Sequence, residues 1–331
     1  MYTRKTILIA LLFIGCANDN DMSFLTKFSG NLGGGELVSQ IEYFNRDSPT
    51  HKIYFGEVPI PSGNVINITS DGTSYDQLRT IINGLSGVTA LNPYKVNITG
   101  TFKETDLQAR DYVWLNGTDS NAIVETNGEW DIAVPSDYSF PTESNKLLSA
   151  ITLDKKHGYW NRGNSITTNI TFDSKAVKYN IHGDTGSPSV FHSIVSDCHF
   201  IKRAGVSDNY KFHIGMGASD TQFMSYWNCT REMTGTFVGS AVERMFFWHN
   251  RANQQSVTLL ELIGNDSSNI DMLITTEQES QHADRIIIKN CFSSKTNAKI
   301  VYQKATGSAF NLQVFEIENC PTLTYKETTY P

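Results

Sequence analysis

The sequence predicts an all-β protein, a right-handed single-stranded parallel β-helix with a short capping α-helix near its N-terminus. A short phrase recurs between about residues 177 and 320, consisting of a run of β-forming residues, then Asp or Asn, then usually Cys. Asn, Ser, Thr and Gly are plentiful, as expected of a chain with many turns. No heptad or helical period competes with the repeat.

The repeated phrase predicts a polar ladder along one edge of a stack of strands. Repetition at intervals of tens of residues is typical of stacked architectures. Stacking places each Asn above the one before, where its amide can bond both to its own turn and to the next Asn. The predicted ladder positions are Asp197, Asn228, Asn250, Asn290 and Asn319.

A second set of strands is expected between the ladder phrases. The long interval between Asn250 and Asn290 predicts an additional strand at residues 270–276. The second set is predicted at residues 177–182, 210–214, 257–263 and 299–303. Two or three strands per coil of the stack follow from this spacing.

Four cysteines share one phase of the repeat: Cys198, Cys229, Cys291 and Cys320. An even number of cysteines in an exported chain suggests disulfides. Equivalent residues in a stack point the same way along one wall, however, and we expect only Cys198 and Cys229 to be near neighbours. We therefore predict four free, buried thiols, since a disulfide needs a restricted geometry.

Length and charge limit the function classes. One solenoid domain accounts for 331 residues. The formal net charge of −7 disfavours nucleic-acid binding, which needs a basic stripe. An acidic glycan would also be repelled unless a cation or a local basic patch intervened.

The first residues look like a targeting segment. Arg4 and Lys5 precede an apolar run at residues 7–15 that is too short to span a bilayer. Residues 12–16 are similar to a bacterial lipoprotein box, with Cys16 as the residue to be lipidated. The alternatives are an uncleaved N-terminal element or a start at Met22. Residues 1–21 are thus interpreted as a leader, residues 22–61 as a neck or attachment segment, and residues 62–331 as the β-helix domain.

The start of this domain contains a strand and a helix. Residues 65–69 read as a strand, and Ser74 with Gln77 matches a capping box. Apolar residues follow at helical spacing, so a helix over residues 74–85 is predicted to plug the end of the stack. The residues of this apolar face are Leu78, Ile81, Ile82 and Leu85.

The order of these N-terminal elements resembles that of the pectin-lyase-like superfamily, most closely its pectin methylesterases. Asp71-Gly72 and residues 100–104, Gly-Thr-Phe-Lys-Glu, occupy the places of two phrases of that family, with Phe102 for the usual Tyr. The resemblance implies a right-handed parallel β-helix. It implies little about activity, because this fold carries lyases, hydrolases, esterases and phage tailspikes.

Residues 126–165 interrupt the repeat and read as a loop excursion. Loops on solenoids often build the binding face. Aromatic side chains can lie flat against sugar rings, and the alternative is that they pack the excursion against the stack. The candidate glycan-binding residues are Trp130, Tyr138, Tyr159 and Trp160.

The catalytic phrases of the resembled families are missing from this chain. The best remaining constellation places His182 and Asp184 at a Gly-containing turn beside the excursion, where an acid could orient a general base. His192, Asp197, His199 and His213 lie nearby in sequence, and we interpret Asp197 as a ladder residue. No metal spacing and no cofactor motif occurs, although calcium stays open as an alternative.

Three function hypotheses remain. The first is a non-catalytic, glycan-recognising surface or virion protein such as a tail or receptor-binding component, extracellular or anchored to the cell surface by lipid. The second is a polysaccharide-active lyase or hydrolase that uses a groove near His182 and Asp184. The third is a purely structural assembly component. A polysaccharide or cell-surface glycan is the expected partner, and a virion origin would predict a homotrimer.

Overall fold

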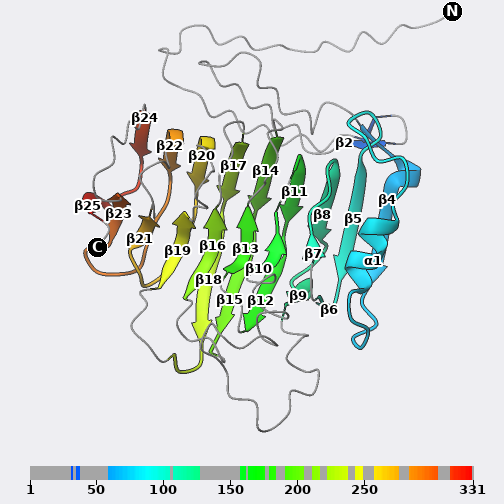
Figure 1. Cartoon of the computed structure of the whole chain (residues 1–331), viewed down its shortest axis with the longest axis horizontal. Coiled ribbons are helices and arrows are strands. Elements are labelled where there is room, and N and C mark those ends of the chain that lie inside the picture. Colours follow the sequence, from blue (N-terminus) through cyan, green and yellow to red (C-terminus); the bar gives the residue numbers. More distant parts are fainter. Residues whose placement is uncertain are drawn as a thin grey trace, which may run out of the picture.

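The structure of the protein is a computed structural model. It describes residues 31–32, 35–37, 59–104, 107–126, 157–161, 163–175, 179–183, 191–204, 211–216, 222–237, 243–248, 257–275, 283–304 and 314–329. Strands dominate these residues, and most of them pair in parallel (Figure 1). The all-β prediction and the prediction of parallel pairing are therefore confirmed.

Three parallel sheets form the body of the molecule. In the described residues sheet 1 contains β4 (Val65–Thr69), β5 (Tyr94–Thr99), β8 (Val113–Gly117), β11 (Ser165–Thr168), β14 (Phe191–Ser196), β17 (Gln222–Trp227), β20 (Val257–Ile263), β22 (Ala283–Lys289) and β24 (Val314–Glu318). Sheet 2 contains β6 (Thr101–Lys103), β9 (Ile123–Glu125), β12 (Thr171–Lys175), β15 (His199–Arg203) and β18 (Thr230–Thr234). Sheet 3 contains β7 (Leu107–Gln108), β10 (His157–Trp160), β13 (Tyr179–Gly183), β16 (Phe212–Met216) and β19 (Arg244–Trp248).

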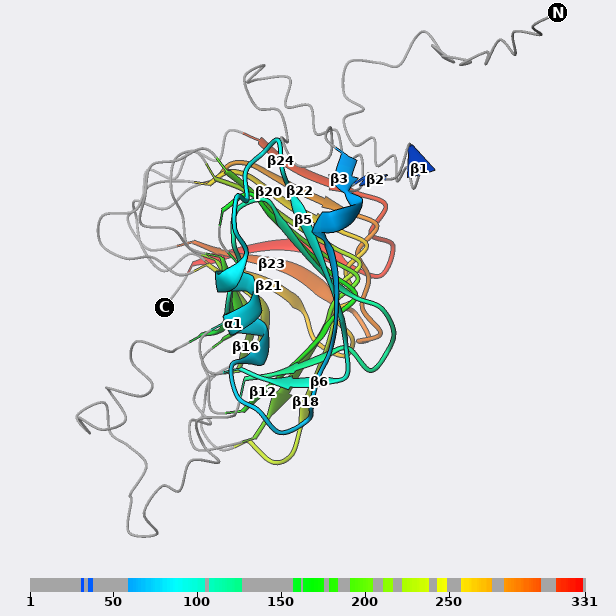
Figure 2. The same ribbon diagram turned by 90° about the vertical axis from the view of Figure 1, so that its right-hand side faces the viewer.

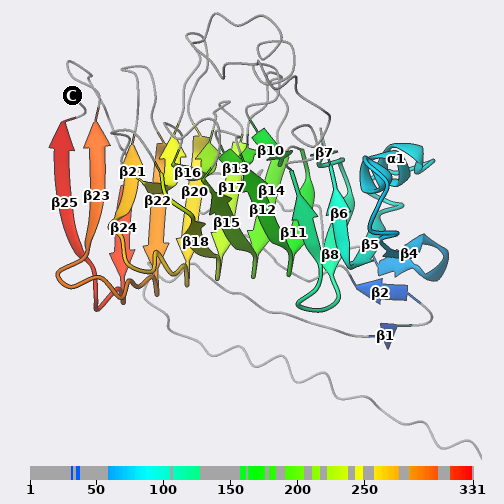
Figure 3. The same cartoon turned by 90° about the horizontal axis from the view of Figure 1, so that it is seen from below.

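The remaining elements lie near the two ends of the stack (Figure 3). Sheet 4 contains β21 (Met272–Thr275), β23 (Lys299–Lys304) and β25 (Thr324–Thr329), and β21 lies beside β19. At the other end lie a small antiparallel sheet, a 3-10 turn and one helix. These are β1 (Asn31–Leu32), β2 (Gly35–Leu37), β3 (Pro59–Pro61), η1 (Ser62–Asn64) and α1 (Gln77–Gly84).

The chain visits sheets 1, 2 and 3 in a fixed order. From β5 to β19 each passage, here called a circuit, adds one strand to each sheet. Successive circuits pair in register, as in Val195 opposite Tyr226 and Phe200 opposite Arg231. Viewed along the stack, the strands of successive circuits lie behind one another (Figure 2). Equivalent residues of neighbouring circuits therefore lie about 4.8 Å apart.

The main core lies on the inner faces of the sheets. Phe172 stacks on Phe200 with ring centroids 5.9 Å apart, and Tyr159 stacks on Phe172 at 5.2 Å. The four cysteines are free and buried, as the sequence predicts. They belong to one inward-facing column in which the middle position is Asn265. This column reads Cys198, Cys229, Asn265, Cys291 and Cys320.

A second apolar cluster lies on the opposite face of sheet 1. Neighbours along a strand alternate between the two faces, so Ile194 belongs to this cluster while Val195 belongs to the main core. Sheet 1 is therefore buried on both faces over its middle strands. The members of this outer cluster are Ile60, Ile166, Ile194, Phe223, Trp227, Leu259, Ile263 and Ile287.

Helix α1 covers one end of the core, as predicted, but its N-terminus is not capped by the predicted box. Leu78 and Ile82 are buried. The backbone N–H groups of Leu78 and Arg79 donate instead to the carboxylate of Glu104, at 2.7 and 3.1 Å. The backbone N–H of Ser74 donates to the Asp71 carboxylate at 2.7 Å, so Ser74 belongs to the turn that precedes the helix.

The predicted assignment of two strands to their sheets is wrong. The sequence pattern places the phrase at residues 244–250 in the ladder, but β19 belongs to sheet 3, and Asn250 lies outside the described residues. The segment that continues sheet 1 is β20, which was assigned to the second strand set. Both are short runs of β-forming residues. The ladder position of this circuit is Gly264, and glycine leaves no polar signal in the sequence.

Candidate functional site

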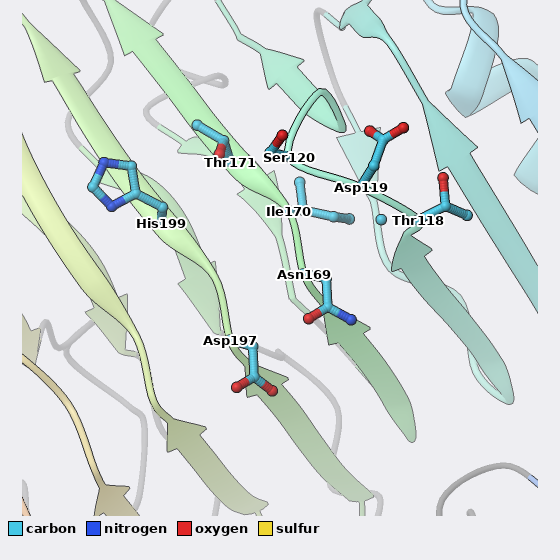
Figure 4. Close-up of a pocket in the computed structure, with 9 residues that line it drawn as sticks. Thr118, Asp119, Ser120, Asn169, Ile170, Thr171, Asp197 and His199 are labelled. Carbon is cyan, nitrogen blue, oxygen red and sulfur yellow. The ribbon is translucent and has the colours of Figure 1, made fainter. Parts of the chain in front are cut away.

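An open groove lies where sheet 1 passes into sheet 2, on the outside of the stack (Figure 4). Its volume is about 440 Å³. Three successive circuits form it, each contributing the residues between one strand of sheet 1 and one of sheet 2. The lining residues are Gly117, Thr118, Asp119, Ser120, Asn169, Ile170, Thr171, Asp197 and His199.

Two walls of the groove are turns with left-handed backbone. Asn169 has φ 58° and Asp197 has φ 56°. Asn and Asp tolerate this region because their short polar side chains bond locally. The same conformation recurs at the equivalent positions Asn228, Asn290 and Asn319, with φ between 49° and 55°. These turns bend each circuit sharply and hold the polar side chains at one edge.

The third wall is the loop from Thr118 to Ser120. The Asp119 carboxylate accepts a hydrogen bond from the backbone N–H of Asn121 at 2.8 Å, which fixes the loop as a tight turn. The hydroxyl group of Thr118 lies 2.5 Å from that of Thr99 on the preceding circuit. The loop therefore lines the groove with one carboxylate-bearing residue and two hydroxyl-bearing residues.

His199 closes the other side. Its Nδ1 lies 2.6 Å from the hydroxyl of Thr230, and its Nε2 lies 3.7 Å from a carboxylate oxygen of Glu232. About a third of the His199 side chain is exposed. This imidazole is therefore held by side chains of the next circuit while part of it stays accessible to solvent.

Sheet 2 carries a bidentate ion pair further along the two strands that contribute Thr171 and His199 to the groove. The guanidinium of Arg203 bonds both carboxylate oxygens of Asp173, with Nε 2.6 Å from Oδ1. The bond to Asp173 raises the pKa of Arg203. A bidentate pair of this kind has a defined geometry, and it holds these two charges together on sheet 2.

The structure adds bonded amides before the predicted ladder and places Gly264, which has no side chain, between two of its members. Asn228 donates to Asp197 at 3.1 Å and Asn319 donates to Asn290 at 2.6 Å. A second run of bonded amides precedes them and was not predicted, because these Asn residues lack the neighbouring Cys. This run contains Asn67, Asn97, Asn116 and Asn169, joined by bonds of 2.9, 2.9 and 3.0 Å.

The predicted catalytic pair is not part of the groove. His182 is fully buried on β13, in contact with the rings of Trp160 and Tyr179. Asp184 lies outside the described residues. A general base must reach its substrate, so the buried His182 is unsuited to that role in this conformation.

Of the four predicted aromatic binding residues, two are buried and two lie outside the described residues. Tyr159 is 1% exposed and stacks on Phe172 in the main core, so it cannot contact a surface ligand. Trp160 is also buried, 6% exposed. Trp130 and Tyr138 lie outside the described residues, as does Cys16.

Two buried polar clusters occur away from the groove. On sheet 1 the hydroxyl of Ser225 lies 2.8 Å from Nε2 of His192 and donates to Glu261 at 2.8 Å. In the core, Glu243 accepts from His213 at 2.8 Å and pairs with Arg231. Both clusters pair polar groups that would be costly to bury alone, although Nδ1 of His213 and Nε of Arg231 have no hydrogen-bond partner among the described residues.

Among the described residues, no group of three or more His, Cys, Asp or Glu side chains is arranged to hold a metal ion. A membrane-crossing helix was also not found in this part of the chain. No protein-family model matches the sequence, and no curated protein matches it either.

Proposed function

We propose that the chain is a glycan-recognising surface or virion protein built on a right-handed parallel β-helix of the pectin-lyase-like superfamily. The fixed order in which the chain visits three parallel sheets supports this fold. Crossover connections between parallel strands are right-handed in nearly all proteins, which supports the hand. An experimental structure with left-handed circuits would contradict the proposal.

One observation carries the binding function. The groove is lined mainly by hydroxyl, amide, carboxylate and imidazole groups, contributed by three successive circuits. Such groups suit a ligand rich in hydroxyls. Circuits repeat about every 4.8 Å, so the stack offers related polar groups along one direction. An extended saccharide chain suits this surface better than a compact metabolite does.

The proposed site therefore differs from the aromatic platform expected from sequence. Recognition in the groove relies on polar groups held rigidly by turns and by the bonded amides of the ladder. A rigid site loses little conformational freedom on binding, which favours affinity. The extracellular or virion location and a homotrimeric assembly belong to the same proposal, and the sequence of residues 1–21 supports the export part of it.

Glycan-array binding followed by matched variants tests the proposal. Asn169→Gly removes an amide from the groove, and Asn319→Gly removes an equivalent ladder amide outside it. Both positions have left-handed backbone, which Gly accepts without strain. We expect weaker glycan binding in Asn169→Gly and unchanged binding in Asn319→Gly. An array on which the wild-type protein binds nothing would contradict the function.

A polysaccharide-cleaving activity is the second candidate, and His199 favours it. This partly exposed imidazole lies in the same groove as the carboxylates of Asp119 and Asp197. An imidazole and two acids are groups that general acid–base chemistry uses. If the protein is an enzyme, His199→Gln abolishes product formation from the bound polysaccharide while binding persists. Unchanged product formation in this variant would exclude His199 from the chemistry.

A further inference from the structure

The hydrogen bonds of the ladder all run in one direction. Asn97 donates to Asn67, Asn116 to Asn97, and Asn169 to Asn116. Asn228 donates to Asp197 in the same sense. In each of these bonds the side-chain amide N–H belongs to the later circuit, and the oxygen that accepts it belongs to the preceding circuit.

This sequence of donors and acceptors is interrupted between Asn169 and Asp197. The two residues lie on adjacent circuits, since the backbone N–H of Asn169 donates to the carbonyl of Ser196 at 3.2 Å. The amide nitrogen of Asn169 already bonds Asn116, and its oxygen lies on the side of Asp197 (Figure 4). A carboxylate has no N–H group to offer. The gap in the ladder is thus bordered by an amide oxygen and a carboxylate on adjacent circuits, both of them acceptors.

The interruption lies inside the groove. Asn169 and Asp197 both line it. The carboxylate of Asp197 also accepts bonds from Asn228 and from the hydroxyl of Ser196, so protein donors already hold it in place. Two oriented oxygen acceptors at a solvent-accessible surface form a position that a donor group of a ligand would complete.

We propose that this acceptor pair binds a hydroxyl group of the glycan, and that the site therefore selects neutral sugars over uronic acids. The inference rests on the proposed function and adds the ligand chemistry. A hydroxyl that donates to a carboxylate forms a charge-assisted bond, stronger than a neutral one. A uronate carboxylate at the same position offers no donor and is repelled by Asp197.

A cation is the other occupant with matching chemistry. The described residues contain no group of three or more His, Cys, Asp or Glu side chains suited to a metal. Calcium usually takes six to eight oxygen ligands, whereas this position offers one carboxylate and one amide oxygen. These facts favour the hydroxyl, and chelation distinguishes the two.

The variant Asp197→Asn tests the inference because it closes the gap between Asn169 and Asp197 in the ladder. The new amide can donate to Asn169 while its oxygen still accepts from Asn228, and Asn tolerates the left-handed backbone. We expect two effects together: a Tm of the free protein raised by a few degrees, and binding of a neutral oligosaccharide weakened about ten-fold, the equivalent of one good hydrogen bond. For the binding measurement, Asp71→Asn is the charge control, since it removes one exposed carboxylate charge outside the groove.

Each result bears on the inference separately from the proposed function. If the wild-type protein binds neither neutral nor acidic oligosaccharides, the proposed function is overturned and the inference with it. Wild-type binding that Asp197→Asn leaves unchanged would overturn the inference alone. Binding that EDTA abolishes would assign the position to a cation instead. Stronger binding of uronate oligomers than of their neutral counterparts would also overturn the inference.

Discussion

Single residues inside the stack carry ionisable groups that an apolar core rarely holds. Lys202 on β15 is 1% exposed, and its Nζ has no hydrogen-bond partner among the residues that the structure describes. Strand alternation places it on the inner face with Phe200. Burial lowers the pKa of Lys202 to about 7. The interior therefore favours the neutral amine over the ammonium ion.

The first prediction concerns the pH dependence of stability through Lys202. The unfolded chain binds the Lys202 proton up to a pKa of about 10.5, and the folded protein only up to about 7. The free energy of unfolding should therefore rise with pH between these values, by on the order of 5 kcal/mol. Urea unfolding of the wild type and of Lys202→Met across this range isolates the contribution.

Lys202→Met should be more stable at pH 7 and lower, because the buried amine is replaced by an apolar chain of similar length. Lys326→Met, at an exposed position, is the control. Parallel pH profiles for wild type and Lys202→Met would show that Lys202 is solvated in the folded protein.

The groove shows what residue patterns could and could not predict. Asp197 and His199 were already singled out in the sequence because they belong to the repeated phrase. Asn169 was missed because Ile170 stands where the other phrases have Cys. Asp119 lies in a loop without any repeat, and its position depends on long-range pairing. The burial of His182 follows from packing that no local pattern encodes.

At the scale of elements, helix α1 depends on a residue of the next circuit. Glu104 is fully buried, and its two oxygens accept the N–H groups at the start of the helix. These groups have no partner within a helix. The C-terminal end is held similarly, since Arg110 donates to the carbonyl of Ile82 at 2.8 Å. The cap is thus bound to the stack at both ends.

The second prediction concerns this cap. Glu104→Ala leaves two buried N–H groups without acceptors and should lower the free energy of unfolding by about 2–4 kcal/mol. Glu104→Gln keeps one acceptor and should cost less. Chemical denaturation of the three proteins measures the difference. Equal stability of Glu104→Ala and the wild type would mean that water replaces the carboxylate.

The third prediction uses the pH dependence of the same carboxyl. Burial raises the pKa of Glu104 from 4.5 to about 7, although its two N–H bonds act in the opposite direction. The folded protein then holds the proton more tightly than the unfolded chain. Stability should fall as pH rises from about 4.5 to about 7, and then level off. Glu104→Gln should lack this slope in otherwise identical unfolding experiments, and a retained slope would assign it to another group.

The fourth prediction concerns the turn after β20. Gly264 has φ 67°, and a Cβ there would lie 2.2 Å from the side-chain oxygen of Asn228. Gly264→Ala should therefore strain the backbone and displace Asn228 from Asp197, at a cost of about 1–3 kcal/mol. Gly63→Ala is the control, because a Cβ at that site meets no atom within 4 Å. Equal unfolding midpoints for both variants would contradict the role of Gly264.

At the scale of the whole molecule, parallel stacking was predictable and the assignment of every strand to a sheet was not. Each of the repeated phrases around Cys198, Cys229, Cys291 and Cys320 contains the end of a strand of sheet 1 and the turn after it. The circuit between Asn228 and Asn290 carries Gly264 and Asn265 in place of Asn and Cys. With both markers gone, β19 and β20 are equally good candidates from sequence, and only pairing across circuits distinguishes them.

The last prediction concerns the loss of one end of the stack. Most contacts between strands join neighbouring circuits. In such a stack, stability is approximately a sum of unit and interface contributions. Deleting residues 314–331 removes β24, β25, Cys320 and Leu323, and leaves Cys291 in the newly exposed layer. The shortened protein should keep its β-sheet circular dichroism with a lower Tm. A thiol probe applied without denaturant should label Cys291 far faster than in the full chain, while Cys198 and Cys229 stay protected two or more circuits away. Equal labelling of all three cysteines would show instead that the stack unfolds as one cooperative unit when its last circuit is lost.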